Sequence, residues 1–288
     1  MVLAQNQWEK FFDLATMPPD QIKLDSSALL IASLFDPKVN VDQELGNLDM
    51  MARVATRRVG STDNHLTAIN NLSEYLFDEL GFTGNSNDYY DPSNSLLPEV
   101  LSSRSGIPIT LSLIYIEIGR RLGIPLTGIG MPGHFLVGHR DITGLFIDPF
   151  NRGILLNETE CMERMMHVTD DINWDPKYLL PISHKEFISR MIRNLKVSLI
   201  ATQDYSGALR MIDWLIKADP TIGHERLDRG LVNYHLERYD EALNDMRMYL
   251  SSERPYSNSK LAQEIINRIE PICAVSYTHL TLPTNREV

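Results

Sequence analysis

Apolar residues recur every three to four positions through most of the first hundred residues, which is the spacing of amphipathic helices. The pattern predicts long helices over residues 41–59 and 65–80, and a shorter apolar run covers residues 28–35. Gly81 follows the second long helix, at the position where glycine commonly ends a helix. The amino-terminal third is therefore predicted to be helical.

The segment after residue 106 is apolar on nearly every side at helical spacing. Residues 107–122 carry two apolar faces, which is typical of a helix buried at the centre of a domain. Pro108 suits the first turn of such a helix, because the backbone N–H that proline lacks has no partner there. A loop rich in turn-forming residues, 82–95, precedes it.

The period of the pattern then changes from about four residues to two. Residues 126–131, 134–139 and 144–148 read as three short strands, with residues 140–144 as a hairpin connection. A buried helix followed by an antiparallel meander predicts an α+β domain. We place this domain at residues 1–181, together with its helical amino-terminal part.

The carboxy-terminal part returns to helices and contains an internal repeat. The Tyr-Ser-Gly-Ala-Leu string at 205–209 recurs as Tyr-Asp-Glu-Ala-Leu at 239–243. The second string begins 34 residues after the first, and this distance matches the period of tetratricopeptide repeats, each of which is a pair of helices. We therefore expect residues 182–275 to form a tetratricopeptide-like helical segment. Residues 276–288 break the helical pattern and resemble translated sequencing adaptor, so we expect a non-native tail there.

Charge and cysteine content exclude several classes of protein. The net charge of −11 argues against a broad nucleic-acid-binding surface, which needs clustered lysine and arginine. The amino-terminal residues do not form a secretory signal, and charges interrupt every apolar stretch well before the ~18 residues that a membrane span needs. Cys161 and Cys273 are too few for a disulfide framework. These features predict a cytoplasmic protein without nucleic-acid or membrane partners.

The candidate chemistry lies between residues 104 and 153. Its strings are Arg-Ser-Gly-Ile-Pro-Ile-Thr-Leu-Ser at 104–112, Pro-Gly-His-Phe-Leu-Val at 132–137 and Ile-Asp-Pro-Phe at 147–150. This order resembles the transglutaminase-like superfamily, a papain-type fold. The resemblance implies a cysteine at the start of the buried helix, a histidine on the next strand and an aspartate on the strand after that. In such a triad the histidine takes the thiol proton and the aspartate orients the imidazole.

The sequence departs from that triad at the nucleophile. His134 and Asp148 match the histidine and the aspartate, but Pro108 occupies the position of the cysteine. Proline cannot be a nucleophile. The nearby hydroxyl residues Ser105, Thr110 and Ser112 are poor replacements because known triads need nucleophile and base within hydrogen-bond reach. Cys161 lies outside the helix start and reads as a small buried apolar residue.

A closer resemblance covers nearly the whole chain. The Tyr-Tyr-Asp-Pro-Ser-Asn-Ser loop at 89–95, together with the strings above and the repeat helices, is similar to the bacterial SirB-type proteins. The resemblance implies a family in which the cysteine is typically absent. The residues that we expect to line its cleft are Tyr89, Tyr90, Asp91, Asn94, Gly133 and Phe135.

Several of these residues also have purely structural interpretations. His134 could hydrogen-bond Asp148 only to bridge two strands, since buried polar groups are normally paired. Gly133 fits a backbone role, and the tyrosines could pin their loop to the core. The eight histidines show no metal-binding spacing, because His134 and His139 would point to opposite faces of one strand. We expect no metal and no cofactor.

Three functional hypotheses follow. The first is a non-catalytic scaffold or regulatory protein that binds a protein or peptide partner through its carboxy-terminal helices. The second is a hydrolase or acyl transferase in which His134 activates water with help from Asp148. The third is binding of a peptide or small molecule in the relic cleft without turnover.

Overall fold

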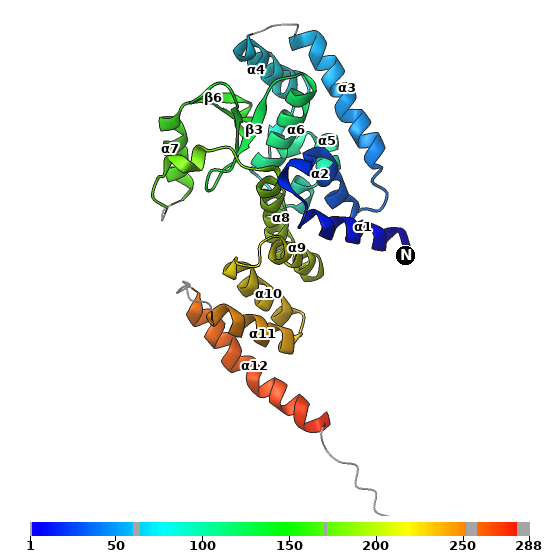
Figure 1. Ribbon diagram of the computed structural model, residues 1–288, viewed down its shortest axis with the longest axis vertical. Coiled ribbons are helices and arrows are strands. Elements are labelled where there is room, and N and C mark those ends of the chain that lie inside the picture. Colours follow the sequence, from blue (N-terminus) through cyan, green and yellow to red (C-terminus); the bar gives the residue numbers. More distant parts are fainter. Residues whose placement is uncertain (1, 60–63, 170–171, 252–257, 281–288) are drawn as a thin grey trace, which may run out of the picture. The chain divides into compact units, whose positions relative to one another are not determined.

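The computed structural model describes residues 2–59, 64–169, 172–251 and 258–280. The chain divides into two compact units, Met1–Asn194 and Leu195–Val288 (Figure 1). The division falls inside helix α8, His184–Ala201. The sequence placed the domain boundary at residues 181–182, just before this helix begins.

The first unit contains seven α-helices before α8 within the described residues. They are α1 (Val2–Leu14), α2 (Leu24–Ser33), α3 (Val41–Val59), α4 (His65–Ser73), α5 (Leu97–Ser103), α6 (Pro108–Arg121) and α7 (Glu158–Val168). The prediction for residues 41–59 matches α3. The prediction of one helix over 65–80 was wrong in its second half, because a π-helix, Glu74–Glu79, follows α4. Its wider turn allows three consecutive side chains, Tyr75, Leu76 and Phe77, to be buried.

The sheet of the first unit has four antiparallel strands in the order β3-β4-β5-β6. They are β3 (Leu126–Ile129), β4 (Leu136–His139), β5 (Phe146–Asp148) and β6 (Ile154–Leu156). The first three correspond to the predicted meander, whereas β6 was not predicted. A second, two-stranded parallel sheet pairs β1 (Thr83–Gly84) with β2 (Ser105–Gly106). The α+β class is therefore confirmed.

Helix α6 is the centre of the first unit. Every residue from Pro108 to Gly119 is buried. The helix contacts β3 and β4 on one side and α2, α3 and α5 on the other (Figure 1). Pro108 is its first residue, within the first turn that the sequence predicted for it, and Ile107 is the N-cap residue.

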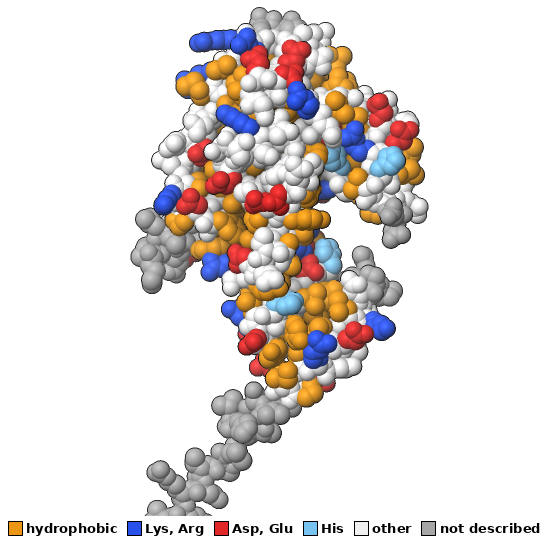
Figure 2. Space-filling view, turned by 180° about the vertical axis from the view of Figure 1, so that it is seen from behind, with side chains coloured by type: hydrophobic (Ala, Val, Ile, Leu, Met, Phe, Trp, Pro, Cys, Tyr) orange, Lys and Arg blue, Asp and Glu red, His pale blue; other side chains and the backbone are white. Residues whose placement is uncertain are grey.

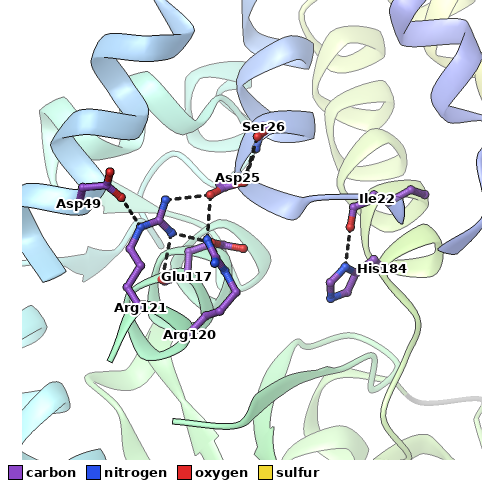
Figure 3. Close-up of polar contacts among 8 residues, drawn as sticks. All are labelled: Ile22, Asp25, Ser26, Asp49, Glu117, Arg120, Arg121 and His184. Carbon is purple, nitrogen blue, oxygen red and sulfur yellow. Dashed lines mark hydrogen bonds and ion pairs between the residues drawn. The ribbon is translucent and has the colours of Figure 1, made fainter. Parts of the chain in front are cut away.

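A buried ion-pair network fixes the far end of α6 (Figure 3). Arg121 donates to Asp25 of α2 at 2.8 Å, to Asp49 of α3 at 2.7 Å and to Glu117 at 2.6 Å. Arg120 also contacts Asp25 and Glu117. Asp25 and Glu117 are almost fully buried, so these arginines are needed to balance their charge. The network ties three helices together at one point.

The second unit contains the last turns of α8 and the helices that follow it. They are α9 (Tyr205–Ala218), α10 (Gly223–His235), α11 (Tyr239–Leu250) and α12 (Ser259–Leu280). Gly230 of α10 faces Met246 of α11 so closely that an added Cβ would lie 2.9 Å from its terminal methyl group. This glycine therefore permits close packing of the two helices. A buried lysine, Lys196, pairs with Glu225 at 2.9 Å inside this unit.

Helix α12 corrects one expectation about the end of the chain. It continues through residues 276–280, which we expected to lack a helical pattern, and residues 281–288 lie outside the described residues. Among the helices that the structure describes, none has the length and apolar character needed to cross a membrane. On the face shown in Figure 2, basic and acidic side chains are intermixed.

Candidate functional site

The structure brings His134 and Asp148 into direct contact. Nε2 of His134 lies 2.9 Å from Oδ2 of Asp148, and the two side chains are 9% and 0% exposed. Asp148 is the last residue of β5. His134 lies two residues before β4, in the turn that leads into it, and not on the strand itself.

Asp148 makes more hydrogen bonds than the pairing with His134 requires. Its carboxylate also accepts from Nη1 of Arg164 in α7 at 2.7 Å, and from the backbone and side-chain amides of Asn151 at 3.2 and 2.9 Å. Burial alone would raise the pKa of Asp148. The hydrogen bond and charge of His134, helped by Asn151 and Arg164, outweigh burial and hold that pKa below its ordinary value. Asp148 is therefore ionised at neutral pH.

Arg190 of α8 fixes the turn that presents His134. Its guanidinium donates to three backbone carbonyls, Gly130 at 2.7 Å, Met131 at 2.6 Å and His134 at 2.8 Å. The backbone of Gly133 has φ of 71°, a conformation that glycine adopts without strain. The turn and the carboxylate thus hold the imidazole from two sides.

An aromatic group covers the histidine. The ring of Phe150 meets His134 edge-on with centroids 6.0 Å apart, and Tyr89 meets Phe150 edge-on at 6.4 Å. Burial raises the pKa of the Tyr89 hydroxyl, and the positive charge of Arg190 opposes that rise. Tyr89 therefore lies at the site. Tyr90 contacts Tyr89 but is 57% exposed.

The remaining loop residues that we expected in the cleft hold the loop together. Asn94 is buried and donates to the carbonyl of Asp88 at 2.6 Å, while its own side-chain oxygen accepts from Asn85 at 3.0 Å. Asp91 caps the short 3-10 helix Pro92–Ser95 through the backbone of Ser93. Phe135 lies in the core against Phe187, with ring centroids 4.8 Å apart. These three residues have structural roles.

The structure argues against Thr110, Ser112 and Cys161 as replacement nucleophiles. Oγ1 of Thr110 donates to the carbonyl of Asn94 at 2.8 Å and accepts from the backbone of Ile107 at 3.1 Å, so this hydroxyl is committed to the helix start. Ser112 is fully buried within α6. Cys161 of α7 has no exposed surface, and burial raises the pKa of its thiol to about 12. A thiol with that pKa is a poor nucleophile at neutral pH.

The geometry leaves one reactive atom at the site. Asp148 accepts the proton on Nε2, so the neutral imidazole carries its lone pair on Nδ1. Within the described part of the chain, Nδ1 makes no hydrogen bond. This nitrogen can accept a proton or a hydrogen bond from a bound molecule.

Sequence reasoning did not identify three residues that shape the site, Phe150, Arg164 and Arg190. Phe150 stood in the recognised Ile-Asp-Pro-Phe string, and the other two carry no local sequence pattern.

Comparison with known proteins agrees with this architecture. Residues 42–193 match the family profile described as the transglutaminase-like superfamily, and residues 195–269 match the tetratricopeptide repeat. No solved structure shows significant similarity.

Three bacterial relatives cover most of the chain. A UPF0162 protein of Xylella fastidiosa is 36% identical over 83% of this chain and 86% of its own length. The UPF0162 protein PA3419 of Pseudomonas aeruginosa is 31% identical, covering 88% of this chain and 92% of its own length. Protein SirB1 of Salmonella typhimurium is 28% identical over 79% and 85% of the two chains.

The resemblance to SirB-type proteins is thereby confirmed. The chain belongs to the transglutaminase-like superfamily, and its transglutaminase-like domain is followed by a tetratricopeptide region.

Proposed function

We propose that this protein is a non-catalytic member of its superfamily and that its tetratricopeptide region binds a protein partner. The observation that carries the proposal is Pro108, the first residue of the buried helix α6, at the position where the sequence resemblance implies the nucleophile cysteine. The hydroxyl of Thr110 is bonded within the fold and the thiol of Cys161 is buried, so neither replaces it. The domain keeps its fold and loses covalent acyl transfer.

A polar groove in the second unit offers a surface for the partner. Its lining comes from α9, α10, α11 and the residue before α11, and comprises Leu209, Asp213, Arg229, Asn233, Arg238, Glu241, Asn244 and Asp245. Arg229 is held by Asp245 at 2.7 Å and by Asp213 at 3.0 Å, which fixes the groove floor. Arg238 and Asn244 are exposed there. Exposed amide and guanidinium groups suit the hydrogen-bonding groups of a peptide.

The test is affinity capture with full-length baits from a bacterium that expresses a close relative. The baits are the wild type, the double variant Arg238→Ala/Asn244→Ala, and His134→Ala. A partner that is lost only with the groove variant supports the proposal. A partner that is lost only with His134→Ala assigns recognition to the relic cleft instead, and the absence of any specific partner contradicts the proposal.

A second candidate function rests on the free Nδ1 atom of His134. A bound water held at that nitrogen would lose its proton to the imidazole, so the domain could act as a hydrolase without a covalent intermediate. General base catalysis contributes about 10²–10⁴-fold in rate. Screening of the wild type against amide and ester substrates tests this alternative. Any turnover that His134→Gln leaves unchanged excludes the histidine as its base.

The same screen tests the non-catalytic proposal. A covalent adduct between the wild-type protein and a glutamine-based acyl probe would overturn it. We expect no adduct, because the described residues near the start of α6 offer no free thiol.

A further inference from the structure

Three side chains that are far apart in sequence meet at one edge of the first unit. His65 is the first residue of α4, His139 is the last residue of β4, and Asp141 lies two residues later in the turn toward β5. One ligand atom from each lies within 4.8 Å of the other two. The two imidazole rings are 4.7 Å apart between centroids and inclined at 48°. This cluster is separate from the site around His134.

His139 is buried with an incomplete set of hydrogen bonds. His139 is only 6% exposed. Its Nδ1 accepts a hydrogen bond from the backbone N–H of Asp141 at 3.1 Å. Nε2 is buried, and no residue in the described part of the chain bonds to it. A buried polar atom without a partner is destabilising, so such atoms are uncommon unless something else satisfies them.

We propose that His65, His139 and Asp141 bind a zinc ion. Two imidazoles and one carboxylate are the donor set that Zn²⁺ accepts readily and Mg²⁺ does not. The ion would satisfy the otherwise unpaired Nε2 of His139. Asp141 is exposed and His65 is partly exposed, so the fourth position of a tetrahedral ion is open to water or to a ligand from solvent.

Binding requires only local movement. Ligand atoms of a tetrahedral zinc site lie about 3.3 Å apart, from bond lengths of about 2.0–2.1 Å. The three side chains must therefore close by about 1.5 Å at most. Asp141 moves its carboxylate toward the ion. For Nε2 of His139 to bind the ion, the backbone N–H of Asp141 must also leave Nδ1, because the ring proton has to move to that nitrogen. The ring proton then passes from Nε2 to Nδ1, so the imidazole stays neutral.

The test is zinc titration of the full-length chain without a polyhistidine tag, followed by isothermal calorimetry. We expect the wild type to bind about one Zn²⁺ per chain, with Mg²⁺ giving no heat. His65→Ala and Asp141→Asn should each weaken zinc binding by about 10-fold or more. Asp141 is exposed and His65 is partly exposed, so these variants should stay close to the melting temperature of the wild type when no metal is present.

His167→Ala serves as the matched control, because His167 is an exposed histidine on α7 outside the cluster. We expect this variant to bind zinc as the wild type does, and zinc to raise the melting temperature of both. Zinc binding that is equal in the wild type, His65→Ala and Asp141→Asn overturns the proposal, as does a wild type that binds no zinc.

Discussion

Arg164 and His134 share one oxygen atom of Asp148: Oδ2 accepts from Nη1 of Arg164 at 2.7 Å and from Nε2 of His134 at 2.9 Å. The negative charge of Asp148 is therefore divided between an arginine from α7 and the candidate site histidine. This arrangement makes the aspartate a structural anchor as well as an orienting group for the imidazole.

The first prediction concerns the stability that this anchor provides. Asp148→Asn removes a fully buried charge that faces Arg164, whose side chain is 29% exposed, and we expect a loss of about 2 kcal/mol in the free energy of unfolding. Urea denaturation measures it. Asp78→Asn, which alters an exposed pair with Arg152, is the control and should change stability by less than about 1 kcal/mol. Equal stabilities for the two variants would contradict the prediction.

The second prediction concerns acid stability. The pKa of Asp148 is lower in the folded protein than its unfolded value of about 3.9, so its ionised form stabilises the fold above that value. This contribution is lost as the pH falls through the folded pKa, below about pH 4. Melting temperatures between pH 7 and pH 3 should therefore fall less steeply at the acid end for Asp148→Asn than for the wild type. Parallel curves would show that another carboxylate, such as Asp25, determines how the melting temperature falls at acid pH.

The third prediction concerns the structural role of the Thr110 hydroxyl. Thr110→Val leaves the carbonyl of Asn94 and the N–H of Ile107 without their partner, at a cost of about 1–3 kcal/mol. Thr110→Ser keeps the hydroxyl and should lose less, which chemical denaturation can measure. If valine is tolerated as well as serine, the hydroxyl does not hold the helix start.

The fourth prediction tests whether Pro108 occupies the nucleophile position. If Pro108 occupies the nucleophile position, the amino terminus of α6 and the imidazole of His134 should favour the thiolate in Pro108→Cys. Iodoacetamide should then label residue 108 faster than Cys161, although both positions are buried. Peptide mass spectrometry measures both rates. The control is Pro108→Cys combined with His134→Ala, in which labelling should slow. A rate independent of His134 would place the two residues too far apart.

The sequence predicted the parts of the fold that repeat a local pattern. The apolar faces of 107–122 identified a buried central helix, and the two-residue period identified β3, β4 and β5. The π-helix was missed because three consecutive buried residues, Tyr75 to Phe77, fit neither period. Strand β6 was missed because Ile154 and Leu155 are both exposed and only Leu156 is buried, so the segment shows no alternation.

The candidate site was predictable only where a motif carried it. The His134 and Asp148 pairing followed from two short strings, but Arg164 and Arg190 reach the site from helices elsewhere in the chain. The cluster of His65, His139 and Asp141 was invisible for the same reason, since 74 residues separate its two histidines. Long-range contacts of this kind depend on packing, which sequence spacing does not record.

The hydrogen bonds of Asn94 have a consequence for proteolysis. Loop 82–95 is long, rich in turn formers and contains two adjacent tyrosines, which makes it a natural substrate for chymotrypsin. A protease must extend the segment that it cuts, and the amide of Asn94 ties this segment to Asn85 and Asp88. Cleavage at the tyrosines therefore requires that those bonds open first, so the loop resists digestion for as long as Asn94 stays buried.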